Sequence, residues 1–388
     1  MCDKLPHRSH LVKEESKNMK RIFFAILLVC FGLLTFAQTE VSWPNYRGTN
    51  VLNGISHSKL NTPIKLIWSF KTGDELKSSP IIGENMIFIG STNGTLYALD
   101  KAGKLKWKFK TEASIEASPI LIKKTVIIGS MSGMVYALDY LTGKVKWKFK
   151  TEGQVLGSAN WTSDGTTIQI LISSYDFNLY SLNLETGKLI WKSETDNYLN
   201  GSAATDNKKI VIGGCDAFIH IIDANSGKQI SKIEAGTYIP ESAAIAGNLA
   251  FVGDYDGGFY CVDLVENKLK WKFTNPKVAA FASSPAVTSD RVIIGSHDKK
   301  VYCFNKQTGK ILWTYKTYGK IESSPVVLND KVIICSNDGV IHFISAINGK
   351  KQYTYELGTA MKSSPAIINN LLVVGGKDGK VYAFKGTL

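Results

Sequence analysis

Acidic residues recur at one position of a repeating pattern in this sequence, and a ring of carboxylates could bind calcium. The acids are Asp176, Asp216, Asp256, Asp298, Asp338 and Asp378, with Asn93 and Ser132 at the two remaining positions. Calcium takes six to eight oxygen ligands, so a metal-binding collar is one hypothesis. Several of these residues form Asp-Gly or Asn-Gly pairs, which are the preferred two-residue turns of β-hairpins. We therefore expect hairpin turns here and no metal site.

Serines also recur at fixed spacing, and a serine can act as a nucleophile when a base lies beside it. They are Ser79, Ser118, Ser202, Ser242, Ser284, Ser324 and Ser364. No histidine or aspartate recurs next to them at catalytic spacing, and no paired-histidine zinc motif is present. Four cysteines follow residue 37 and show no CxxC spacing: Cys215, Cys261, Cys303 and Cys335. The sequence thus predicts no catalytic residues and no zinc or redox site.

Tryptophans show which elements position these residues. They stand at Trp68, Trp107, Trp147, Trp191, Trp271 and Trp313, while Ser231 and Tyr353 fill two further positions in register. The successive spacings are 39, 40, 44, 40, 40, 42 and 40 residues. A period of this length indicates a repeat architecture of eight units, which cover residues 64–388.

Each unit contains four short, β-branched runs bounded by turn residues, as in residues 283–315. Such runs read as strands, and four antiparallel strands per unit of about 41 residues indicate a propeller blade. Glycines recur between the third and fourth strands at Gly143, Gly187, Gly227, Gly309 and Gly349, with Asn267 once in their place. Glycine and asparagine both tolerate positive φ, so this position predicts a left-handed turn. The predicted fold is all-β, an eight-bladed β-propeller of four-stranded antiparallel blades.

The last unit stops after its third strand, and the first has a spare strand around Leu66–Phe70. Pairing the two would complete the eighth blade and remove a free sheet edge. We therefore expect a closed ring and a monomer.

The chain carries a formal charge of +13, and phrases such as KLKWKFK at 104–110 resemble a nucleic-acid patch. Lysines that alternate with apolar residues along an outer strand also oppose edge-to-edge pairing. After residue 37 the only arginines are Arg47 and Arg291, although arginine is the usual reader of bases and phosphates. We expect no nucleic-acid partner.

The N-terminal region indicates export. Residues 20–37 combine two positive charges, a short apolar run and a small-x-small ending, which predicts a signal peptide; Met19 is the expected start. Val29 before Cys30 argues against lipidation. The expected organisation is an extension and signal peptide (1–37), a lead segment (38–63) and the propeller (64–388). The mature chain is expected to lack a transmembrane span and to be periplasmic, secreted or at the cell surface.

The repeat resembles the pyrroloquinoline-quinone-like (PQQ-like) repeat family. Its signature stands as Ala137-Leu138-Asp139, Thr142-Gly143 and Trp147, and Trp43-Pro44-Asn45-Tyr46-Arg47-Gly48 is similar to the lead segment of secreted members. The resemblance implies one of two branches: dehydrogenases of alcohols or sugars that bind PQQ with calcium, or non-catalytic scaffolds of the BamB type in outer-membrane protein assembly. The adjacent cysteine pair common in the dehydrogenases is absent, as is a lipidation cysteine of the scaffold branch.

Residues that break the repeat indicate a candidate binding face. They are Tyr175, Phe177, Tyr198, Asn200, Tyr238, Glu241, Asp254 and Tyr255, on loops expected to share one face. Tyrosines near carboxylates are typical of interaction surfaces, although simple divergence of the blades would also produce them. We expect a binding or scaffold propeller without a cofactor, with envelope proteins, including outer-membrane β-barrel assembly components, as partners. The alternatives are a PQQ-dependent dehydrogenase and a carbohydrate-binding surface protein.

Overall fold

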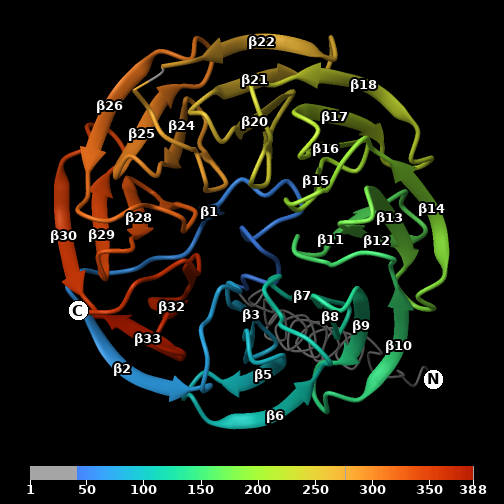
Figure 1. The fold of residues 1–388 in the computed structure, drawn as a ribbon. Helices are drawn as coiled ribbons and strands as arrows, with labels where there is room; N and C mark the ends of the chain where they lie inside the picture. Colours follow the sequence, from blue (N-terminus) through green and yellow to red (C-terminus); the bar gives the residue numbers. More distant parts are fainter. Residues whose placement is uncertain (1–41, 276, 388) are drawn as a thin grey trace, which may run out of the picture. The chain divides into compact units, whose positions relative to one another are not determined.

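The computed structural model describes residues 42–275 and 277–387. They form eight antiparallel sheets arranged as blades around a central axis, which confirms the predicted propeller (Figure 1). The expected signal peptide lies outside the described residues. Within the described ranges, no helix is long and apolar enough to cross a membrane.

The first four blades each contain four consecutive strands. The first blade comprises β3 (Ile81–Gly83), β4 (Met86–Gly90), β5 (Thr95–Asp100) and β6 (Leu105–Lys110). The second comprises β7 (Ile120–Ile122), β8 (Thr125–Gly129), β9 (Met134–Asp139) and β10 (Val145–Lys150). The third comprises β11 (Asn160–Ser163), β12 (Ile168–Ser173), β13 (Asn178–Asn183) and β14 (Leu189–Glu194). The fourth comprises β15 (Ala204–Thr205), β16 (Lys209–Gly213), β17 (Phe218–Asp223) and β18 (Gln229–Glu234).

The next three blades repeat this order. The fifth comprises β19 (Ala244–Ala246), β20 (Leu249–Gly253), β21 (Phe259–Asp263) and β22 (Lys268–Phe273). The sixth comprises β23 (Ala286–Val287), β24 (Arg291–Gly295), β25 (Lys300–Asn305) and β26 (Ile311–Lys316). The seventh comprises β27 (Val326–Leu328), β28 (Lys331–Cys335), β29 (Val340–Ser345) and β30 (Lys351–Glu356).

The eighth blade joins the two ends of the ring. It contains β31 (Ala366–Ile368), β32 (Leu371–Gly375) and β33 (Lys380–Gly386), and its outer strand is β2 (Ile64–Lys71). Strand β2 pairs antiparallel with β33 along its whole length, as predicted from the spare strand. The sequence did not indicate β1 (Ile55–Ser56), which pairs in parallel with β27 and adds a fifth strand to the seventh blade.

Each blade runs from a short inner strand at the axis to an exposed outer strand. The antiparallel order places the second-to-third turns and the loops between blades on one side, named here the pocket face. The first-to-second and third-to-fourth turns lie on the opposite side, named the rim face. In β6 the lysines are exposed while Trp107 and Phe109 are half-buried, the alternation expected of a strand with one packed face.

The outer-strand tryptophans link neighbouring blades. The indole of Trp107 donates to the backbone oxygen of Tyr140 (2.9 Å) and covers Gly143 in the next third-to-fourth turn. Gly143 has φ of +70°, and a Cβ there would lie 2.7 Å from the indole. The same stacking relates Trp68 to Gly103, Trp147 to Gly187, Trp191 to Gly227, Trp271 to Gly309 and Trp313 to Gly349. The glycine is therefore required both by the left-handed turn and by the indole above it.

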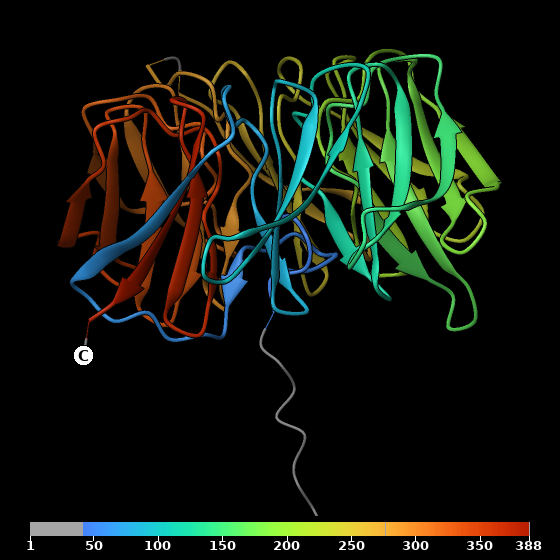
Figure 2. The ribbon, with the colours of Figure 1, turned by 90° about the horizontal axis from the view of Figure 1, so that it is seen from below.

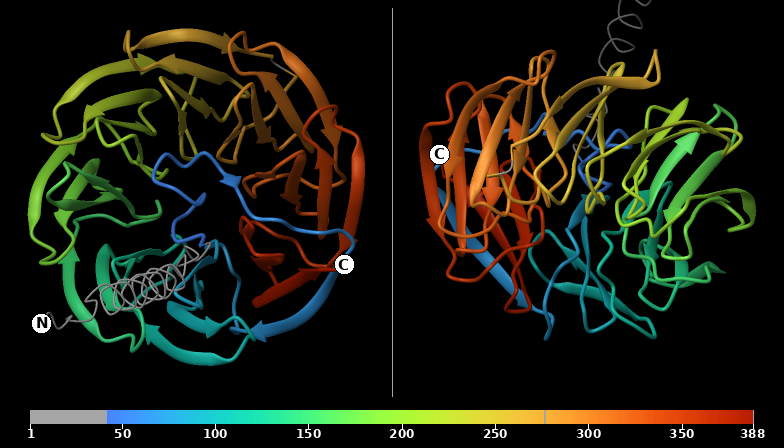
Figure 3. Two further views of the ribbon diagram at one scale, coloured as in Figure 1. Left: turned by 180° about the vertical axis from the view of Figure 1, so that it is seen from behind. Right: turned by 45° about the horizontal axis from the view of Figure 1, so that its top comes forward.

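The lead segment occupies the axis on the rim face. It runs across the middle of the ring in the left panel of Figure 3 and along the lower edge in Figure 2. Its carbonyl oxygens accept backbone N–H groups at one equivalent inner-strand position of six blades, at 2.7–3.0 Å: Ile82, Leu121, Thr205, Ile245, Val287 and Val327. Inner strands are sheet edges, so the segment satisfies groups that would otherwise be unpaired.

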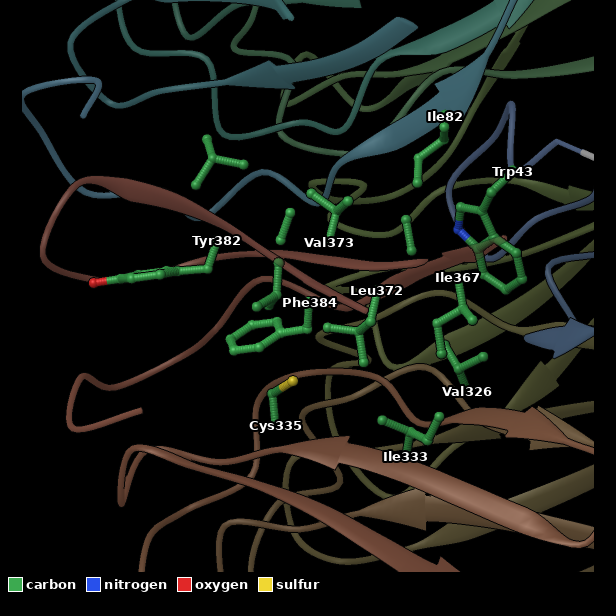
Figure 4. Packing of buried hydrophobic residues seen from close by; sticks show 14 of the residues in the cluster. Trp43, Ile82, Val326, Ile333, Cys335, Ile367, Leu372, Val373, Tyr382 and Phe384 are labelled. Atoms are coloured by element: carbon green, nitrogen blue, oxygen red, sulfur yellow. The ribbon is translucent and has the colours of Figure 1, made fainter. Parts of the chain in front are cut away.

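The hydrophobic core lies between adjacent blades. In the cluster shared by the seventh, eighth and first blades, Trp43 of the lead segment packs with Ile82 and Ile367 (Figure 4). Burial of such side chains stabilises the fold by about 1.5–3 kcal/mol each. The lead segment is thus part of the core as well as a cap on the axis. Cys261 and Cys303 are fully buried within third strands and act as small core residues.

Candidate functional site

Eight serines form a ring around the axis, one ahead of each inner strand. In seven neighbouring pairs the backbone N–H of one serine donates to the Oγ of the next, at 2.8–3.2 Å. The bond from Ser364 to Ser79 joins the last blade to the first. The serines therefore link neighbouring blades around the axis. The sequence reasoning missed Ser158, although its spacing of 40 residues from Ser118 was a usable signal.

Tyr46 closes the ring of serines from the rim face. Its hydroxyl forms hydrogen bonds with the Oγ atoms of Ser284 (3.2 Å) and Ser324 (3.0 Å). Above this floor lies a cavity of about 400 Å³ that opens on the pocket face. This volume is at the small end of the range for ligand sites. The axis is therefore a blind pocket rather than a channel.

Charged residues surround one half of the cavity. They occupy the position two residues before the ring serine in four consecutive blades. Lys77 pairs with Glu116 (2.8 Å), and Lys362 pairs with Glu322 (3.3 Å). The other half carries Leu156, Asn200, Pro240 and Ala282 at the same position. The cavity thus has a charge-balanced half and an uncharged half.

Glu241 directly precedes the ring serine Ser242 and differs in type from the equivalent residues of the other blades. The other blades have serine, alanine or glycine at this position. Burial raises the pKa of Glu241 to about 8; Glu322 adds to the shift, while Arg47 and Lys362 oppose it. The carboxyl group lines the cavity and retains some access to water. At neutral pH it is therefore mostly protonated and can donate a hydrogen bond.

Arg47 lies beneath this floor and is 1% exposed. Its Nη2 donates to the backbone oxygen of Pro285 (3.1 Å), whereas Nε and Nη1 have no hydrogen-bond partner within the described part of the chain. Burial lowers the pKa of Arg47 to about 10, and the charge of Tyr46 or Glu241, when ionised, opposes the shift. Arg47 remains a cation at neutral pH.

Aromatic side chains border the uncharged half of the cavity. Tyr175 and Tyr198 stack with ring centroids 4.8 Å apart, and Phe177 meets Tyr198 edge-on at 5.1 Å. Tyr238 and Tyr255 form a second stack at 4.5 Å. These five residues are named the aromatic arc; Tyr175 also lines the cavity. The structure thus brings together most of the predicted binding face.

Asn200 and Asp254, the two remaining predicted residues, lie in different surroundings: the first lines the cavity and the second is buried in a turn. Asn200 lines the cavity, accepts a hydrogen bond from the Tyr175 hydroxyl and donates to Cys215 Sγ (2.9 Å). Asp254 is 1% exposed and accepts hydrogen bonds from the Gly258 N–H (2.6 Å) and the Tyr260 hydroxyl (2.7 Å). Asp254 therefore lies inside its turn, away from the exposed part of the arc.

Most acids of the repeat serve their turns, but in the fifth blade Asp254 takes this role in place of Asp256. Asp176 accepts the N–H groups of Glu152 and Asn178 and the hydroxyl of Tyr180, at 2.8–3.1 Å. The same contact, four residues apart, joins Asp298 to Tyr302 and Asp378 to Tyr382 (2.6 Å). Their oxygens stabilise hairpins, in agreement with the expected turn role. Across the described residues, no group of three or more His, Cys, Asp or Glu side chains could hold a metal ion.

The lysines that line the cavity already have acidic partners, which bears on the cofactor that the repeat class suggests. PQQ is a tricarboxylate and needs cationic partners. Lys77 and Lys362 are already paired with Glu116 and Glu322, while Glu241 is mostly protonated at neutral pH. Three more carboxylates here would compete with Glu116 and Glu322 for these two lysines.

The fold and its repeat define a β-propeller of the PQQ-like class. A family model described as outer membrane protein assembly factor BamB matches residues 64–211, 175–301 and 268–387, and the chain belongs to this family. No curated protein sequence matches the chain significantly.

Solved structures share the fold at low sequence identity. BamB from Moraxella catarrhalis aligns with a TM-score of 0.71 at 20% identity, over 83% of this chain and 99% of that one. The computationally designed Ika8 protein has the same score and coverage at 16% identity. A europium-containing methanol dehydrogenase also scores 0.71, at 12% identity over 90% of this chain and 98% of its own. Equal scores mean that the backbone alone does not separate scaffold from enzyme.

Proposed function

We propose that this chain is a non-catalytic propeller of the cell envelope that binds proteins as a scaffold in outer-membrane protein assembly. The observation that carries the proposal is the aromatic arc beside a blind, charge-balanced pocket. Tyr198 and Tyr255 are 44% and 42% exposed although each is stacked on a second tyrosine. Pre-ordered, half-exposed tyrosines supply contact area at little entropic cost. The family match supports this role, and export by residues 1–37 would deliver the chain to the envelope.

Site-specific photocrosslinking in the native envelope tests the proposal. A crosslinker at Tyr198 is expected to capture envelope proteins. The matched control is Gln307, which is exposed in a third-to-fourth turn on the rim face. Alanine at both Tyr198 and Tyr255 should then reduce binding of a captured protein by about 10-fold or more, as for interface hot spots. Equal capture from both positions would contradict a binding surface at the arc.

Two other functions give different results in direct titrations. A PQQ-dependent dehydrogenase would show saturable, calcium-dependent quinone absorbance changes; the charge balance of the cavity predicts none. A carbohydrate-binding protein would be retained on a glycan column, with retention lost when Tyr175 is replaced by alanine. Either positive result, together with no crosslinked protein, would replace the scaffold proposal.

A further inference from the structure

The rim face carries an ordered ring of lysines on the side opposite the pocket. A lysine directly follows the glycine of each third-to-fourth turn, and six of these side chains are exposed and not ion-paired within the described residues: Lys104, Lys144, Lys188, Lys228, Lys310 and Lys350. The seventh, Lys268, follows Asn267 and pairs with Glu266 (3.0 Å). Resistance to edge pairing explains lysines along the outer strands, but the six turn lysines other than Lys268 lie before the first paired residue of their strands.

Three of these turns also expose a large aliphatic side chain at the tip. Leu141, Val265 and Ile347 are 60%, 63% and 63% exposed, more than any aliphatic residue of the outer strands. Each precedes the turn lysine by three residues, so an apolar tip and a cation share one turn. Exposed aliphatics on a monomer need no explanation singly, but here they recur at equivalent positions.

Their distribution around the ring restricts the partner. The three tips belong to the second, fifth and seventh blades, so they are spread around the circumference instead of forming a patch. A flat surface can contact all three together, because equivalent turns of a closed ring end at a similar height.

Acids of the same rim oppose the positive field of the turn lysines. Asp139, Asp223 and Asp263 end third strands, and each accepts N–H groups from its own turn. Hydrogen bonding to the turn lowers the pKa of each, so all three stay charged. In the sixth and seventh blades the same position is Asn305 and Ser345, and neither third-to-fourth turn contains an acid; the third blade has Asn183 there but carries Glu185 in its turn.

We propose that the rim face is a docking surface for an anionic lipid bilayer. The lysines would interact with acidic headgroups, and the tips of Leu141, Val265 and Ile347 would enter the headgroup region. Stable peripheral binding needs two signals, and this rim combines charge with apolar insertion. Docking this way leaves the pocket and the aromatic arc directed away from the membrane. The inference is independent of the function proposed above.

Vesicle co-sedimentation tests the proposal with the chain from residue 38 onward, which contains the complete ring. The probes are vesicles of phosphatidylcholine alone and of phosphatidylcholine with about 30% phosphatidylglycerol. Binding is expected only to the anionic vesicles and should weaken between about 0.1 and 0.5 M salt, because the Debye length shortens. Equal affinity for both vesicle types, or none for either, would overturn the proposal.

Two rim variants and one control variant test whether the rim face makes the contact with the vesicle. Replacing Lys144, Lys310 and Lys350 by glutamine should lower affinity by about 100-fold, at roughly fivefold per lysine. Replacing Leu141, Val265 and Ile347 by serine should lower it about 10-fold or more. The control is Tyr318→Ser with Lys320→Gln, an exposed apolar and basic pair on the pocket face. Loss of binding in the control, or retention in both rim variants, would place the contact elsewhere.

Discussion

Ser231 and Asn267 replace, in neighbouring blades, the tryptophan and the glycine that pack together elsewhere in the ring. The Ser231 hydroxyl donates to the backbone oxygen of Asn267 at 3.2 Å. Lys209 fills the remaining space: its ammonium donates to the backbone oxygen of Leu264 and to Asn267 Oδ1. Leu264 is equivalent to Leu184, whose carbonyl the indole of Trp147 reaches. A lysine thus satisfies the carbonyl that an indole satisfies in other blades.

This relationship predicts strong coupling between Trp147 and Gly187. A Cβ on Gly187 would lie 2.5 Å from the indole, so Gly187→Asn alone should cost about 1–3 kcal/mol of unfolding free energy. Trp147→Ser alone should cost about 3–5 kcal/mol. The double variant recreates the Ser231 and Asn267 arrangement, and asparagine tolerates the left-handed turn. Its cost should fall below the sum by about 1 kcal/mol or more, measured by urea unfolding. Additive costs would mean that the indole does not exclude other residues from the turn.

The sequence predicted the ring because each blade repeats its own local rules. The tryptophan register gave eight units, and the glycine positions gave turns whose φ is positive in the structure. Closure followed from a missing fourth strand, now supplied by β2. These features depend on contacts within one blade or between neighbours, which recur at one spacing.

The site was less predictable because it depends on the whole ring. Lys77 pairs with Glu116 of the next blade, and Lys362 with Glu322 of the previous one, so no single unit displays the charge balance. The lead segment has no period, and its route around the axis could not be read from its residues. The structure gives Asn160 a supporting role beneath the site.

Asn160 is predicted to hold the lead segment in place. Its side chain accepts the amide of Asn45 (2.7 Å) and donates to the backbone oxygens of Asn50 (2.8 Å) and Ala203 (2.7 Å). Asn160→Ala leaves buried groups unpaired and should cost about 2–4 kcal/mol. Urea unfolding measures the loss, and limited proteolysis should show earlier cleavage within residues 42–56. Asn225→Ala, in an exposed turn, is the control and should change neither result. Unchanged proteolysis in the Asn160 variant would assign the anchoring to the backbone bonds alone.

Glu241 is predicted to make the stability of the ring depend on pH. Its pKa is about 8 in the folded chain against an ordinary value of 4.5, so between these values the folded state binds a proton that the unfolded state lacks. Stability from this group is therefore complete below about pH 4.5 and is lost as pH rises to 8, by on the order of 3 kcal/mol.

Glu241→Gln keeps the shape of the protonated group and should remove this decline. The measurement is urea unfolding of both proteins at pH 5, 6.5 and 8; taking the difference between them cancels every contribution that the two proteins share. Because glutamine resembles the protonated acid, the two curves should agree near pH 5 and separate toward pH 8, with the variant the more stable. Curves that stay parallel across this range would show that Glu241 is ionised in the folded ring, with Arg47 beneath it as its counter-charge.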